Sequence, residues 1–89
     1  MAYTIVIIST ASITNDWIHK FRNFGEDIWK QLRDESEISL EEIDSCTDRF
    51  EIRGIKAKKV KRIEKLVLDI SKGHFVYDDI DLEINRDQV

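Results

Sequence analysis

The sequence predicts an α+β domain of the ferredoxin-like type, a four-stranded antiparallel sheet with two helices on one face. Its apolar residues recur with strand and helix periods in the order β-α-β-β-α-β. Two crossovers flank a predicted hairpin, and right-handed crossovers place both helices on the same side of the sheet. The 89 residues include no Pro and only three Gly. Regular elements joined by short turns are therefore expected to form one domain, residues 1–89.

The first half of the chain predicts a strand followed by a helix. Residues 2–9 are rich in β-branched side chains and apolar on both parities, which is typical of a central strand covered on both faces. Apolar residues then recur at three- and four-residue steps over 13–32, so a helix is expected there, with Ser12 or Thr14 as its N-cap. Trp29 lies off the main apolar stripe and is predicted to anchor a partner.

The second half predicts a hairpin, a helix and a last strand. Segments 40–46 and 49–55 are expected to pair as strands, with residues 47–48 at the tip. A second helix is predicted over 56–71 because its apolar residues return on one face. The last strand, 80–84, alternates apolar and acidic residues. Across the sheet we expect the order last, first, third and second strand, with the last strand at an edge.

The net charge of −4 conceals a separation of charge along the chain. Segment 34–51 has eight acidic residues and one Arg, and segment 74–89 has five acidic residues and one Arg. Segment 56–72 has seven basic and two acidic residues. Blocks of one sign indicate which surfaces could meet charged partners.

Strand alternation predicts that the acidic residues gather on the open face of the sheet. If the apolar side chains of each strand point at the helices, the acidic ones between them point the other way. Carboxylates at this spacing repel one another. Two interpretations follow, a solvated face that favours solubility and a docking surface for a basic partner. The predicted set is Glu42, Asp44, Glu51, Asp79, Asp81 and Glu83.

Basic residues crowd the first half of the second predicted helix. The helix macrodipole disfavours cations at an N-terminus, so their concentration there costs some stability. One interpretation is a solvated helix face that also pairs with the acidic segments of the protein. The other is a patch that binds nucleic acid or an acidic partner. The residues are Lys56, Lys58, Lys59, Lys61, Arg62 and Lys65.

The residue types that carry catalysis are isolated in this sequence. The single Cys46 provides neither an intrachain disulfide nor zinc-ligand spacing. His19 and His74 have no nucleophile in a recognisable context, and a glycine-rich phosphate loop is absent. No segment approaches the roughly 20 apolar residues that span a membrane. We therefore expect a cytoplasmic binding protein, with no enzymatic activity, no cofactor, no metal and no membrane partner.

The chain as a whole resembles small bacterial immunity proteins in its small size, acidity and single-domain α/β build. The resemblance includes a C-terminal run of helix, Gly and strand, residues 62–73 and 78–84. These proteins inhibit nuclease toxins delivered by colicins or contact-dependent inhibition systems. The resemblance implies a protein partner, a basic nuclease toxin, bound through an acidic surface. Phage-encoded nuclease inhibitors, including anti-CRISPR proteins, are similar in size and charge. Two other hypotheses remain: a nucleic-acid-binding regulator that uses the basic helix, and a homo-oligomer that joins basic helix to acidic sheet.

Overall fold

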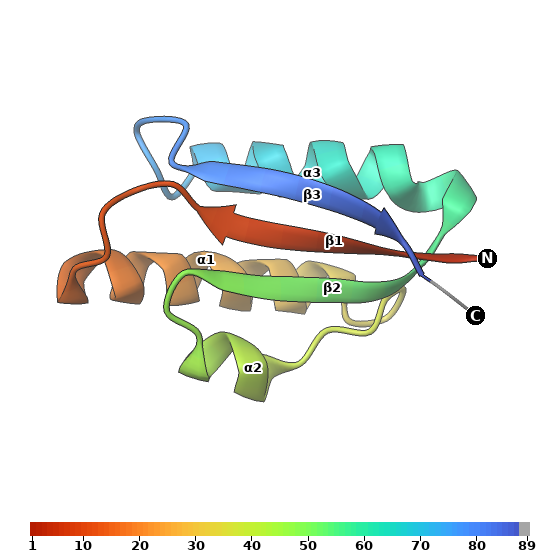
Figure 1. Cartoon of the computed structure of the whole chain (residues 1–89), viewed down its shortest axis with the longest axis horizontal. Helices are drawn as coiled ribbons and strands as arrows, with labels where there is room; N and C mark the ends of the chain where they lie inside the picture. Colours follow the sequence, from red (N-terminus) through yellow and green to blue (C-terminus); the bar gives the residue numbers. More distant parts are fainter. Residues whose placement is uncertain (88–89) are drawn as a thin grey trace.

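A computed structural model describes residues 1–87 and shows a sheet layer packed on a helix layer. The three strands form one antiparallel sheet in the order β2-β1-β3. In Figure 1, α1 and α3 lie behind this sheet, and α2 lies beside β2. The elements are β1 (Ala2–Ser9), α1 (Asn15–Leu32), α2 (Leu40–Ser45), β2 (Arg49–Lys56), the 3-10 helix η1 (Ala57–Lys59), α3 (Val60–Lys72) and β3 (Ile80–Arg86).

The predicted ferredoxin-like fold is wrong, because residues 40–46 do not form a strand. Over residues 1–87 the sheet has three strands instead of four, and a third helix, α2, replaces the missing one. The cause is a local helix start. The hydroxyl of Ser39 accepts a hydrogen bond from the Glu42 N–H at 3.1 Å, which caps the first turn of α2. Ser-x-x-Glu is the sequence signature of such a start, and it outweighs the strand-like pattern.

The prediction that residues 2–9 form the central strand is confirmed. β1 pairs with β2 on one side and with β3 on the other, so β3 is an edge strand, as expected. Ile5 and Ile7 are fully buried beneath the helices. Val6 points to the opposite face and is only 2% exposed, although no helix of the described chain covers that face (Figure 1). The run Ile5, Val6 and Ile7 is therefore buried on both faces of β1, whereas Thr4 and Ile8 are half-buried.

A bulge in β2 keeps its apolar residues on the helix side. Ile5 is in register with Ile52, but Tyr3 is in register with Ile55, so β2 has one residue more than β1 between these pairs. Gly54 takes a positive φ of 68° at this point, a conformation that costs glycine little. Without the bulge, the period-two alternation would turn Ile52 and Ile55 to opposite faces. Both are instead fully buried.

The core joins α1 to the sheet through aromatic side chains. Thr14 caps α1 by accepting a hydrogen bond from the Trp17 N–H at 3.1 Å, as one of the two predicted N-caps. Phe21 and Phe24 are fully buried, and the rings of Phe21 and Phe50 lie 5.3 Å apart. The remaining side chains of this core come from α1, α2, α3 and the sheet and include Ile28, Leu32, Ile43, Ile63, Val67 and Phe75.

We predict that Gly25→Ala destabilises the protein by about 1–2 kcal/mol. A Cβ at this position would lie 2.7 Å from Cγ2 of Ile43 and 3.3 Å from the Phe50 ring. At 2.7 Å the overpacking falls in the upper part of its range of about 1–3 kcal/mol, so the gain of about 1 kcal/mol in helix propensity leaves a net loss of about 1–2 kcal/mol. Urea denaturation measures the change. Gly73→Ala is the control, because its nearest contact is 3.4 Å. A Gly25→Ala variant as stable as the wild type would contradict this close packing of α2 on α1.

Candidate functional site

The six carboxylates predicted to share the open face fall into separate groups. Two of them stand on α2, because that segment is helical and not extended. Glu51 remains on the open face, in register with Val6. The other three lie within β3 or immediately before it. The groups are Glu42 and Asp44; Glu51; and Asp79, Asp81 and Glu83.

Glu42 and Glu51 are engaged by groups of the protein itself. Glu42 accepts the Glu51 N–H through Oε1 and Nη1 of Arg53 through Oε2, each at 3.0 Å. Nη2 of Arg53 lies 2.6 Å from Oε2 of Glu51. The hydrogen bond to Glu42 raises the pKa of Arg53, as expected for a cation between carboxylates. This network offsets the acidity of the β2 side of the sheet.

Asp44 lies away from the sheet face, beside Glu26 of α1. A hydrogen bond with Asp44 raises the pKa of Glu26, and burial and charge repulsion from Asp44 act in the same direction. Two carboxyls that share a site cannot both ionise freely. Asp44 therefore belongs to the contact between α1 and α2 and does not extend the acidic surface of the sheet.

Four acidic residues lie on β3 or immediately before it, and we call this group the acidic edge, defined as Asp78, Asp79, Asp81 and Glu83. Ile80 is 8% exposed and Leu82 is half-buried on the helix side. Asp81 and Glu83 consequently point to the open face, as the alternation predicted. Within residues 1–87, none of the four carboxylates forms an ion pair. Glu83 accepts a hydrogen bond from Nδ2 of Asn85 at 3.0 Å, which leaves its negative charge in place.

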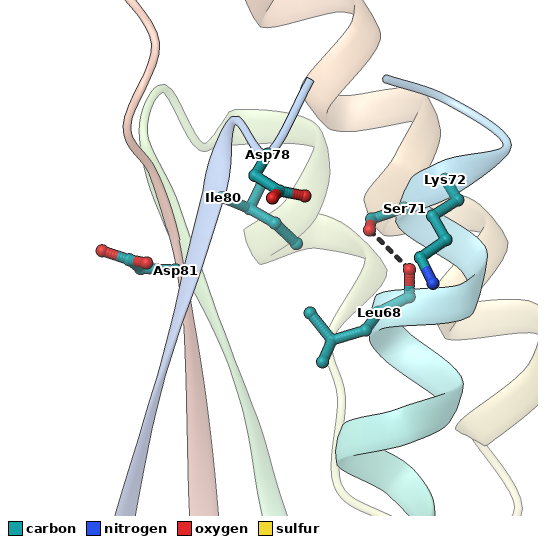
Figure 2. Close-up of a pocket in the computed structure, with 6 residues that line it drawn as sticks. All are labelled: Leu68, Ser71, Lys72, Asp78, Ile80 and Asp81. Carbon is teal, nitrogen blue, oxygen red and sulfur yellow. Dashed lines mark hydrogen bonds between the residues drawn. The ribbon is translucent and has the colours of Figure 1, made fainter. Parts of the chain in front are cut away.

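An open depression of about 350 Å³ adjoins the acidic edge, between the end of α3 and the start of β3. Figure 2 shows Leu68 and Ile80 pointing toward one another across it, while Asp81 extends from the other side of the strand. Leu68 is 40% exposed, which is unusual for a large apolar side chain of an amphipathic helix. The edge therefore combines carboxylates with apolar contact area. Ser71, Lys72 and Asp78 complete the lining.

Trp29 does not join the acidic edge. It is half-buried on α1, and the guanidinium of Arg33 lies 4.7 Å from the centre of its ring. Gly25, one helical turn earlier, contacts Ile43 of α2. Asp27 contacts His74, which follows α3, from the other side of α1. Trp29 thus lies on the α2 side of α1, away from β3.

The predicted basic residues gather where β2 passes through η1 into α3, and we call this group the basic end. Figure 1 places this junction near the chain N-terminus, at the opposite end of the molecule from the start of β3. Arg62 pairs with Glu35, and it is the only member with an ion pair among residues 1–87. No side chain caps the start of α3. The basic end comprises Lys56, Lys58, Lys59, Lys61, Arg62 and Lys65.

Cys46 and His74 lie in structural contacts, whereas His19 is exposed on α1. Cys46 is buried, and burial raises the pKa of its thiol, while its carbonyl accepts Nε of Arg22 at 2.9 Å. Nε2 of His74 lies 3.1 Å from Oδ2 of Asp27. Sequence periodicity gave no sign of this pair, because 47 residues separate its members.

The described residues contain no group of three or more His, Cys, Asp or Glu that could hold a metal ion. None of the helices within residues 1–87 is long and apolar enough to cross a bilayer. Comparison with known proteins gives no match among family models, curated proteins or solved structures. The geometry of the chain therefore carries the functional argument.

The contact between Asp27 and His74 predicts a pH-dependent contribution to stability. The hydrogen bond between Asp27 and His74 lowers the pKa of Asp27 from its ordinary value of 3.8. The stabilisation is complete at a pH above this ordinary pKa. It is lost as the pH falls through the lowered pKa that Asp27 has in the folded protein. Asp27→Asn should lower the free energy of unfolding at pH 7 by less than about 1 kcal/mol, because the carboxylate is partly exposed.

Urea melts at pH 7 and pH 2 test this prediction, with Asp34→Asn as the matched control at an exposed position. The difference between Asp27→Asn and the wild type should shrink at the lower pH, whereas the control should change little at either. An equal loss at both pH values would contradict an ionic contribution of Asp27.

Proposed function

We propose that this protein is a cytoplasmic protein-binding inhibitor of the immunity type, which neutralises a basic nuclease toxin. One observation carries the proposal. Four carboxylates lie within six residues at an edge of the sheet, and none is paired within the described part of the chain. A protein gains no stability from such mutual repulsion, so a partner of opposite charge provides the better explanation.

A nuclease presents a positively charged groove to the phosphates of its substrate. Asp81 and Glu83 stand on the strand itself and are held with less freedom than carboxylates on a loop, so less entropy is lost when they bind. Complementary charge steers the two proteins together and accelerates association. A domain that occupies the groove excludes the substrate without any chemistry of its own. The structural engagement of Cys46 and His74 supports a role in binding over one in catalysis.

Reversal of charge at the acidic edge tests the proposal, with the product of a neighbouring gene assayed as the candidate nuclease toxin. Asp79→Lys, Asp81→Lys and Glu83→Lys together should abolish protection in cells that express both proteins. The association rate should fall at least about tenfold and lose much of its dependence on salt. Surface plasmon resonance across a salt series measures both quantities.

The matched control reverses three exposed carboxylates elsewhere, Asp34→Lys, Glu41→Lys and Asp48→Lys, and so makes the same change in net charge. Circular dichroism establishes that both triple variants fold. If the two variants lost protection and association rate equally, net charge would explain the effect and the acidic edge would have no specific role. A neighbouring gene whose product leaves nucleic acid intact would oppose the nuclease-toxin assignment.

The basic end favours a second candidate function, nucleic-acid binding. Its lysines have no ion-pair partner among residues 1–87, and they surround a helix start without a side-chain cap. Such a surface favours phosphate by charge alone. Arg62 is less available because it already pairs with Glu35.

A salt series with a 20-base-pair DNA duplex and an RNA hairpin tests this candidate. If the lysines contact phosphates, log affinity falls linearly with log salt, with a slope of about −0.9 per phosphate contact on duplex DNA. Lys58→Glu with Lys61→Glu should reduce the slope by about 2, whereas Lys20→Glu with Lys30→Glu on α1 should change it less. Absence of binding at low salt would exclude this function.

A further inference from the structure

The two edges of the sheet differ in whether other parts of the protein bind their outward backbone groups. Along the outer edge of β2, the Glu51 N–H donates to the Glu42 carboxylate at 3.0 Å. Arg53 exchanges two backbone hydrogen bonds with Glu37, at 2.7 and 2.8 Å. The chain itself therefore occupies this edge, and an incoming strand would have to displace both contacts.

The hydrogen bonds at both ends of β3 show which of its backbone groups face outward. The Thr10 N–H donates to the Asp79 carbonyl at 2.8 Å, and the Asp87 N–H donates to the Ala2 carbonyl at 2.9 Å. In the β1–β3 register, continued by one residue at each end, Thr10 lies opposite Asp79, and Ala2 lies opposite Asp87. In an antiparallel pair every second residue bonds to the neighbouring strand, so the odd-numbered residues from 79 to 87 bond to β1. Ile80, Leu82 and Ile84 therefore direct their N–H and C=O groups away from the sheet.

These outward groups of β3 have no hydrogen-bond partner among residues 1–87. The β1–β3 register runs from Tyr3 to Ser9 without a shift, so no bulge interrupts this edge. The side chains that flank it have two characters. Leu68 and Ile84, 40% and 39% exposed, are apolar and on the helix side, whereas Asp81 and Glu83 are acidic and on the open face.

From this combination we propose that β3 receives an extended segment of a protein partner as a fourth strand, with Lys or Arg at alternate positions. Its basic side chains lie over Asp81 and Glu83, and its apolar side chains lie toward Leu68 and the depression beside it. The backbone ladder supplies affinity, and the two rows of side chains supply specificity. The inference rests on the proposed function, because it describes how a basic partner engages the acidic edge.

Charge complementarity decides between this partner and a second copy of the chain. In an antiparallel pair of β3 strands centred on Leu82, Asp81 of each copy lies opposite Glu83 of the other. Like charges directly opposite one another destabilise a strand pair. A segment with basic residues at the same positions converts this repulsion into attraction, so the edge fits a basic strand better than it fits itself.

Three synthetic peptides of equal charge provide the probe. The first is acetyl-Lys-Val-Lys-Val-Lys-Val-Lys-amide, the second carries N-methyl groups on its valines, and the third carries them on its lysines. N-methylation removes the donors along one side of an extended strand and leaves the charge unchanged. We expect one methylated peptide to bind at least tenfold more weakly than the first. Weaker binding of the peptide with methylated valines indicates that it pairs as an antiparallel strand. Weaker binding of the peptide with methylated lysines indicates that it pairs as a parallel strand.

Hydrogen exchange followed by NMR supplies a second measurement on the intact protein. The unmodified peptide should slow exchange of the Leu82 and Ile84 amides at least tenfold. The Glu51 and Arg53 amides, which face the covered edge, should not change. Protection of the β3 amides together with loss of binding by one methylated peptide supports the proposal.

The outcomes also separate this inference from the proposed function. If all three peptides bound alike and Asp81→Asn with Glu83→Gln weakened all three, the strand pairing would be overturned, while electrostatic recognition of a basic partner would stand. If none bound at low salt, the strand pairing would be overturned, while the charge-reversal assay would decide the proposed function separately. If the protein alone sedimented as a dimer with Leu82 and Ile84 already protected, the occupant would be a second copy, which also overturns the inference.

Discussion

The pairing of β1 on both of its sides is the constraint on which the rest of the structure depends. A central strand with buried side chains on both parities needs a partner strand at each side and a helix layer over one face. The helix layer is supplied by α1 and α3 (Figure 1). On the opposite face Val6 lies between its register partners Glu51 and Glu83 and is only 2% exposed. Once β1 is central in a three-stranded sheet, β2 and β3 are both edges. The chain must then either cover each edge or leave it for other molecules.

The elements that could be predicted from the sequence are those in which the spacing of apolar residues matches the face that is buried. Residues 2–9 have no polar side, and α1 repeats its apolar residues over five turns, so neither pattern fits another structure. Segment 40–46 was different, because Leu40 and Ile43 fit a short helix as well as an irregular strand. The hydrogen bond to Ser39 at the first turn favours the helix, and Ile43 is fully buried in this conformation. Local capping chemistry thus supplied information that periodicity did not.

In the candidate site, side-chain orientation along a strand was predictable from the sequence, whereas contacts between distant segments were not. Alternation along β3 placed Asp81 and Glu83 on the open face, because a strand orients its side chains by parity alone. The positions of Glu42 and Asp44 depended on the mistaken strand and changed with it. The engagement of Glu51 by Arg53 could not be read from the sequence, since it requires the bulge at Gly54 and the approach of α2. Charge patterning identified the acidic and basic regions, but only the three-dimensional arrangement showed which charges are already paired.

The contact that Glu42 makes at the β2 edge affects how many molecules can add a strand to this sheet. The Glu42 carboxylate holds the Glu51 amide, and the Glu37–Arg53 bridge occupies the next outward position, so one flank of the sheet is sealed from within. A sheet with a single open flank is monovalent for strand addition. It can form a closed pair with another molecule, but it cannot propagate as a chain of sheets. A molecule with both flanks open would be divalent, and repeated addition would lead to fibres. If strands add to this sheet as proposed, the segment from Glu37 to Glu42 would restrict addition to the β3 edge and so limit the size of the complex.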